Sequence, residues 1–175
     1  MEVWMSTKDF DSLVKVARTS KNIGEKIATI EHLGVLETQS TLRDLYKSES
    51  NPKVKEQLIE SLMMTGDIEI LSNILENETG EKILTNAISV AAPFANKDVL
   101  NKLIITYQKT NRDVVKKAII EGYMNSHDSM RLAELLVTET NTNTELQEDI
   151  IEMLGVMNDD VATAALTKLY KNQRI

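Results

Sequence analysis

Five similar segments of about thirty residues follow one another along this chain, and their repetition constrains the fold more than any single residue does. An apolar anchor position recurs at intervals of 29, 29, 32 and 31 residues: Leu33, Leu62, Ala91, Tyr123 and Leu154. Twelve residues after each anchor lies a large aliphatic residue: Leu45, Ile74, Leu103, Leu135 and Leu166. Three residues before each anchor lies an isoleucine: Ile30, Ile59, Ile88, Ile120 and Ile151. Such a period is typical of arrays of two-helix repeats.

The apolar residues inside each segment predict helices, because they recur at spacings of three and four and so share one helical face. Polar residues predict where the helices begin. Five residues after each anchor is a side chain able to cap the second helix of a hairpin: Thr38, Asp67, Asn96, Asp128 and Asp159. Between repeats, a second set predicts caps for the first helices: Asn22, Asn51, Gly80 and Asn143, with Asn111 one residue out of register. Pro52 suits a first helical position, and Pro93 should end the helix before it.

These signals together predict an all-α chain of eleven helices. A half-repeat helix is expected at 7–20, followed by repeats at about 22–50, 51–79, 80–110, 111–142 and 143–172. The helix pairs are expected at 23–36/39–49, 52–64/67–78, 81–92/97–109, 112–125/128–139 and 144–156/160–171. Because neighbouring hairpins in such an array share one interior, we expect residues 1–175 to form a single domain.

Composition narrows the function classes. The absence of cysteine excludes disulfides, a thiol nucleophile and cysteine-bound metals. No apolar stretch is long enough to span a bilayer, and the first residues do not resemble a signal peptide, so we expect a soluble protein with no membrane partner. The compartment stays open. The half-repeat at the start also leaves open that the sequence is a fragment of a longer protein.

The net charge of −7 argues against a nucleic-acid partner, since phosphate backbones attract clustered Lys and Arg. Residues 132–167 contain eight acids and no Lys or Arg. These acids could attract a basic partner, or they could be a solvated outer face with acids favoured at helix starts.

No catalytic, metal or cofactor site is predicted, and we expect the chain not to be an enzyme. His32 and His127 lie in different repeats, and the chain has no HExxH pair, GxSxG elbow or phosphate-binding glycine loop. Gly34, Gly122 and Gly155, near the ends of first helices, are interpreted as sites of close helix approach or helix termination, with exposure of the backbone to a ligand as the alternative. Trp4 is expected to cover the edge of the first helix, with ligand stacking as the alternative.

One candidate binding surface does emerge, on the second helices opposite their core-facing stripe. Positions seven, eleven and fourteen after the anchor are polar in the first two repeats and become apolar toward the C-terminus. The candidate patch consists of Ile105, Met130, Val137, Val161 and Ala165. It is interpreted either as a contact surface for a protein, a peptide or a second copy, or as a face that packs against further repeats or a curled-in terminus.

The hairpins resemble HEAT repeats. The resemblance rests on the run from Leu146 to Gly155 followed by Asp159-Asp160, and on the segment Val54–Leu75, and it covers about residues 8–172. The first repeat departs from the pattern, with Glu25 at a position that is apolar in the other four. The resemblance implies a right-handed α-α superhelix, or solenoid, whose second helices line a concave face that binds proteins.

The resemblance also sets the functional hypotheses. The leading one is a non-enzymatic interaction module or scaffold with a protein or peptide partner, with self-association through the C-terminal repeats as a further expectation. The alternatives are a HEAT-repeat enzyme of the DNA glycosylase or bilin lyase kind, and a structural or regulatory segment of a larger protein.

Overall fold

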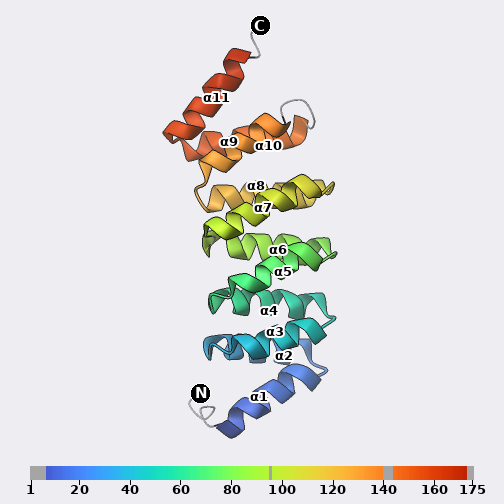
Figure 1. Cartoon of the computed structure of the whole chain (residues 1–175). Helices are drawn as coiled ribbons and strands as arrows, with labels where there is room; N and C mark the ends of the chain where they lie inside the picture. Colours follow the sequence, from blue (N-terminus) through green and yellow to red (C-terminus); the bar gives the residue numbers. More distant parts are fainter. Residues whose placement is uncertain (1–6, 95, 140–143, 173–175) are drawn as a thin grey trace. The chain divides into compact units, whose positions relative to one another are not determined.

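The computed structural model describes residues 7–94, 96–139 and 144–172, and within these ranges the chain is helical with no strand (Figure 1). It contains eleven α-helices, which confirms the predicted all-α class and the predicted number. The helices are α1 Thr7–Thr19, α2 Ile23–Val35, α3 Gln39–Ser48, α4 Pro52–Met64, α5 Ile68–Asn77, α6 Glu81–Ala91, α7 Lys97–Lys109, α8 Asp113–Asn125, α9 Ser129–Glu139, α10 Thr144–Met157 and α11 Asp160–Asn172. Each predicted end lies within one residue of the observed end.

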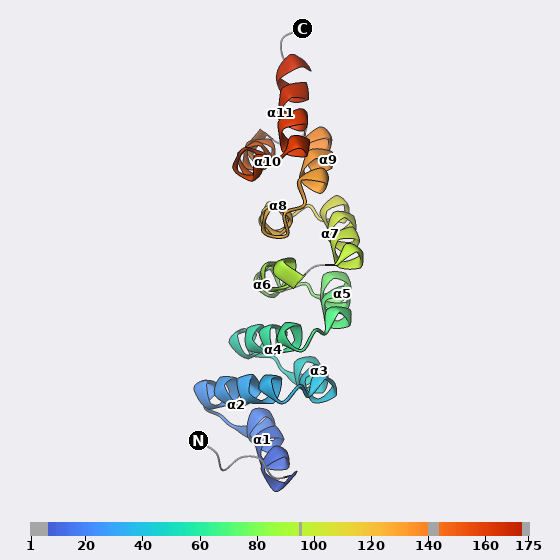
Figure 2. The same cartoon turned by 90° about the vertical axis from the view of Figure 1, so that its left-hand side faces the viewer.

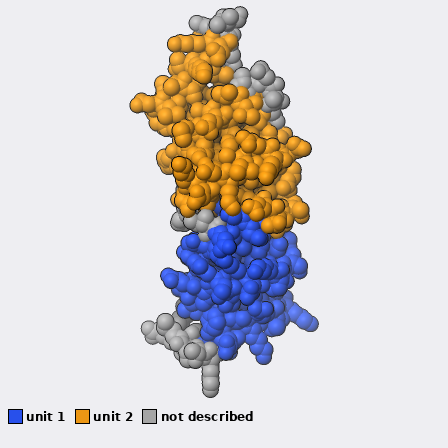
Figure 3. Space-filling view, viewed as in Figure 1, with its two compact units in different colours: residues 1–74 blue, residues 75–175 orange. Residues whose placement is uncertain are grey.

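The chain divides into two compact units, Met1–Ile74 and Leu75–Ile175 (Figure 3). In the first unit, α2 packs against both α1 and α4, and α3 packs against α4. The approach of α2 to α4 is close, because a Cβ atom added at Gly34 would lie 2.9 Å from the Cβ atom of Ser61. Glycine at this position therefore allows the contact, which confirms its interpretation as a site of close helix approach.

In the second unit, the first helices of successive hairpins pack in the order α6, α8, α10 (Figure 2). Helices α7 and α9 both pack against α8, and α11 packs against α9 and α10. A short 3-10 helix at Ala92–Phe94 follows α6, so Pro93 lies just beyond the helix end as predicted.

The turns inside four of the five hairpins share one backbone feature. The residue before the second-helix cap has a positive φ in the first, second, fourth and fifth hairpins: Glu37 (54°), Gly66 (74°), His127 (56°) and Asn158 (50°). In the second repeat, the N–H of Gly66 donates to the carbonyl of Met63 and the N–H of Asp67 to that of Leu62. This pair of bonds is a Schellman ending, which satisfies the last carbonyls of the first helix. The same pair recurs at Glu37 and Thr38, and at His127 and Asp128.

Four of the five predicted second-helix caps are confirmed. Asn96 accepts from the N–H groups of Asp98 and Val99. Asp67, Asp128 and Asp159 each accept from the N–H three residues later: Ile70, Arg131 and Ala162 respectively. Thr38 occupies the N-cap of α3 as predicted, but the predicted cap bond is absent, because its hydroxyl donates to the carbonyl of Leu33.

The first helices follow the predicted caps less regularly. Asn22 and Asn51 each accept two backbone N–H groups, as predicted. Gly80 occupies the N-cap of α6 but has no side chain to accept with. At α8 the prediction is wrong by one residue, because the N-cap is Arg112 rather than Asn111. The predicted cap Asn143 lies outside the described residues, as does Trp4.

The repeated apolar positions form the core. All five anchors are buried, with at most 3% of the residue surface exposed. Leu45, Ile74, Leu103 and Leu135 are buried as well, as are Ile30, Ile59, Ile88 and Ile120. The last hairpin departs from this pattern: Ile151 and Leu166 are half-buried. Its two helices therefore bury less of their apolar face than the equivalent helices before them.

Candidate partner-binding surface

The five residues of the predicted patch all lie in the second unit. Ile105 is on α7, Met130 and Val137 on α9, and Val161 and Ala165 on α11. Four of these side chains are exposed: Ile105 (46%), Met130 (56%), Val137 (69%) and Val161 (44%), whereas Ala165 is half-buried. Exposure of several large aliphatic side chains on neighbouring helices is a feature of contact surfaces.

The contacts between helices divide the five patch residues into two groups. Helices α9 and α11 contact each other directly, which places Met130 and Val137 on one helix and Val161 and Ala165 on its neighbour. Helix α7, which carries Ile105, packs against α8, and α8 in turn packs against α9. That Ile105 joins the other four in one continuous surface stays a prediction.

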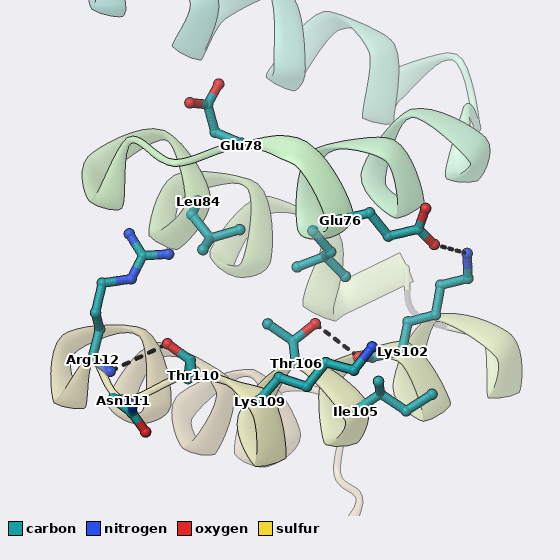
Figure 4. Close-up of a pocket in the computed structure, with 11 residues that line it drawn as sticks. Glu76, Glu78, Leu84, Lys102, Ile105, Thr106, Lys109, Thr110, Asn111 and Arg112 are labelled. Carbon is teal, nitrogen blue, oxygen red and sulfur yellow. Dashed lines mark hydrogen bonds and ion pairs between the residues drawn. The ribbon is translucent and has the colours of Figure 1, made fainter.

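Ile105 has a second role, because it lines a cleft of about 630 Å³ (Figure 4). We name this the α7 cleft. One wall comes from the end of α5, the segment before α6 and Leu84 on α6, and the other from α7 and the α7–α8 connection. Its lining residues are Leu75, Glu76, Glu78, Leu84, Lys102, Ile105, Thr106, Lys109, Thr110, Asn111 and Arg112.

Charged groups stand around this cleft, and most are already positioned by hydrogen bonds. Lys102 pairs with Glu76 at 3.5 Å between Nζ and Oε1. One guanidinium nitrogen of Arg112 donates to the carbonyl of Thr79 at 2.9 Å. Glu78 accepts from the backbone N–H groups of Thr79 and Gly80, and Figure 4 shows its carboxylate pointing away from the other labelled side chains.

Lys109 differs from its neighbours in the cleft. Within the part of the chain that the structure describes, its ammonium group has no hydrogen bond and no ion pair, and the residue is exposed. The apolar part of the lining consists of Leu75, which is half-buried, Leu84, which is buried, and Ile105, which is exposed. The cleft therefore combines an apolar patch with available positive charge.

Sequence reasoning missed the cationic part of this cleft, although a signal was present. Lys102, Ile105, Thr106 and Lys109 recur at helical spacing and so share one face of α7, and Arg112 follows just after the helix ends. The binding surface was predicted from positions that recur in every repeat, and these cations do not recur at equivalent positions.

Away from the cleft, the carboxylate of Glu139 is buried and joins neighbouring helices. Glu139, at the end of α9, is 2% exposed and accepts hydrogen bonds from Tyr107 Oη and Lys116 Nζ, both at 2.9 Å. The Lys116 ammonium also lies 4.7 Å from the centre of the Tyr107 ring. Burial and the bond to Glu139 raise the pKa of Tyr107 well above its usual value, so its hydroxyl stays protonated as a donor.

The first unit has a related pair at the corresponding position. Lys26 on α2 donates to Glu49, just after α3, at 2.6 Å, and both side chains are largely buried. Burial alone would raise the pKa of Glu49, but the bonds from Lys26 and from the N–H groups of Asn51 and Ser50 lower it overall. Lys26 and Lys116 both lie seven residues before an anchor, which makes this a repeated device that joins the two helices of a hairpin.

Neither histidine belongs to a cluster of chemical groups. His127 occupies the positive-φ position of the turn between α8 and α9, which gives it a backbone role. Among the described residues, no three His, Asp or Glu side chains are placed to hold a metal ion. No described helix has the length and apolarity needed to cross a bilayer.

Comparison with known proteins gives no family assignment. A scan against models of protein families finds no match, and a search of curated proteins finds no relative. The likeness to HEAT repeats therefore stays a prediction from the sequence.

Proposed function

We propose that this chain is a non-enzymatic protein-interaction module: a HEAT-like array, coiled as a right-handed superhelix, that binds a protein or peptide partner through its second helices. The observation that carries the proposal is the exposure of Ile105, Met130, Val137 and Val161 on α7, α9 and α11. Removing apolar surface from water contributes roughly 25 cal/mol per Å². Covering these side chains with a partner would therefore contribute to binding.

The test compares two exposed valines of equal exposure. Val137 belongs to the patch, and Val156 on α10 does not, and both are 69% exposed. We expect Val137→Asp, alone or with Ile105→Asp, to abolish capture of the partner from an extract of the source cells. Val156→Asp should leave capture unchanged. Circular dichroism and thermal melting check that each variant is folded; a folded Val137→Asp variant that still captures the same partner would reject the patch.

The array itself is tested in solution. A compact globule of 175 residues has a radius of gyration of about 16 Å by the usual scaling with length. Because a stack of hairpins is elongated, we expect small-angle X-ray scattering to give a clearly larger value. A value near that of a globule would contradict the superhelix.

Self-association is the second candidate, and the last hairpin favours it. Ile151 and Leu166 are half-buried where their equivalents in other repeats are buried, and Tyr170 on α11 is 56% exposed. A second copy could cover these groups. Sedimentation equilibrium over a range of concentrations would show a dimer that Tyr170→Asp weakens, and a monomer at all concentrations would exclude it.

The enzyme alternative predicts a different behaviour. A glycosylase-like protein would need to bind DNA, and the acids of residues 132–167 oppose that. A gel-shift assay at moderate salt is expected to show no complex with duplex DNA.

A further inference from the structure

We propose that the α7 cleft binds a short acidic segment of a partner protein, whose apolar side chain contacts Leu75 and Ile105 and whose flanking carboxylates pair with Lys109 and Arg112. This inference rests on the proposed function and specifies the chemistry of the partner. It depends on three properties of the cleft: its charge, its apolar wall and its size.

The charge of the cleft is the first argument. Three cations line it, Lys102, Lys109 and Arg112, although the chain as a whole carries a charge of −7. Of the two acids in the lining, Glu76 pairs with Lys102 and Glu78 accepts backbone N–H groups. The cationic groups left to meet a ligand are Lys109 and the remaining N–H donors of Arg112, whose guanidinium has five.

The geometry of the cleft is the second argument. In Figure 4, Arg112 stands at one side and the Lys102–Glu76 pair at the other, with Leu84 and Thr106 between them. An apolar centre flanked by charge matches a segment in which an aliphatic or aromatic residue lies between acids. A volume of about 630 Å³ is within the usual range for sites that enclose a small ligand, so it suits a few residues rather than a whole helix.

A nucleic acid fits these observations less well. Phosphate backbones bind through many cations in succession, and the α7 cleft offers few. The same unit contains eight acids with no Lys or Arg across residues 132–167, which repel a long polyanion, and none of them lines this cleft. A short acidic peptide would contact only the cleft and would not extend to these acids.

The experiment uses the full chain and defined probes. Fluorescence anisotropy measures binding of short end-capped, fluorescein-labelled peptides in which one leucine, isoleucine or phenylalanine is flanked by glutamates. Matched probes replace the glutamates by lysines, or the apolar residue by serine, and a single-stranded RNA oligonucleotide of similar charge tests the other class of polymer. The variants are Lys109→Glu in the cleft and Lys97→Glu at the other end of α7, an exposed lysine outside the lining.

We expect the acidic, apolar peptides to bind and the lysine and serine probes to bind much more weakly. Lys109→Glu should weaken binding by about tenfold or more, the size of one charge-assisted contact, and Lys97→Glu by less than about twofold. Raising the salt concentration should also weaken binding. Failure of every acidic peptide to bind, unchanged binding by Lys109→Glu, or preference for the lysine probes or the RNA would each overturn the inference.

Failure of this inference is distinguishable from failure of the proposed function. If Val137→Asp abolishes partner capture while no acidic peptide binds, the interaction module stands and the peptide chemistry is wrong. If the peptides bind through Lys109 while capture is indifferent to Val137, the cleft stands and the patch is wrong.

Discussion

At the scale of single residues, the turns between paired helices are built on a backbone conformation that most residues avoid. Four described positions before the second helices have a positive φ, and only one of them is glycine, Gly66. His127 and Asn158 are residue types that tolerate this region, whereas Glu37 is not. At Glu37 and His127 the Schellman bonds hold this conformation in place.

We therefore expect Glu37→Gly to stabilise the protein by about 1 kcal/mol, because glycine adopts a positive φ without a steric penalty. Urea denaturation followed by circular dichroism measures the change. The control is Glu31→Gly, an exposed position inside α2, where glycine should destabilise by about 1 kcal/mol. Equal destabilisation by both substitutions would contradict the assigned turn geometry.

A second prediction at the residue scale concerns the buried carboxylate of Glu139. Glu139→Gln removes the negative charge beside Lys116 and leaves that ammonium largely buried without its counter-charge. We expect a loss of about 3 kcal/mol in the free energy of unfolding. Tyr107→Phe, which removes one bond to the carboxylate, should cost about 1.5 kcal/mol. Glu134 is exposed on the same helix, so Glu134→Gln should change stability little. An equal loss in both variants would contradict a stabilising role for the contacts of Glu139 with Tyr107 and Lys116.

At the scale of elements, helix pairs are joined by close approach and by ion pairs near their ends. Gly34→Ala places a methyl group against Ser61, so we expect a loss of about 2 kcal/mol from the packing of α2 on α4. The double variant with Ser61→Gly should recover part of this loss, since it removes the atoms that clash. Additive losses in the double-mutant cycle would mean that the two positions do not interact.

The Lys26–Glu49 pair predicts a dependence of stability on pH. The folded state lowers the pKa of Glu49 from its usual value of 4.5, so its contribution is complete above that value. It is lost as the pH falls through the lowered pKa. Measuring the urea midpoint between neutral and acidic pH, we expect Glu49→Gln to be less stable than the native chain at pH 7 and to lose less on acidification. Identical slopes for both proteins would contradict the assignment.

At the scale of the whole molecule, equivalent core positions are less buried in the last hairpin than in the earlier ones. Leu103 is fully buried in the second unit, and Leu166, its equivalent in the last hairpin, is half-buried. We expect Leu103→Ala to cost about 3 kcal/mol and Leu166→Ala about 1 kcal/mol. Hydrogen exchange should accordingly be faster in α11 than in α8. Similar costs for the two leucines would indicate that the last hairpin is as well packed as the others.

The sequence predicted the elements of this fold well, for a physical reason. Helix ends depend on local chemistry such as Asn51-Pro52, Asn96 and Asp159, and each of these signals acts within a few residues of chain. The repeated columns then identified the core, since the same apolar positions must be buried in every hairpin. Two predictions failed: Thr38 is the N-cap of α3 but its hydroxyl bonds to Leu33 instead of capping, and the cap of α8 is Arg112 rather than Asn111, where the repeat is longer.

What the sequence alone determined is therefore the helices, their boundaries and most of the buried residues. Only the tertiary structure decided which groups meet: that Glu139 joins Tyr107 and Lys116, that Gly34 faces Ser61, and that Lys102 pairs with Glu76 across the α7 cleft. These contacts join residues about 20 to 30 positions apart on different helices. Local periodicity carries no information about such pairs, because they depend on how the helices cross and how far each side chain reaches.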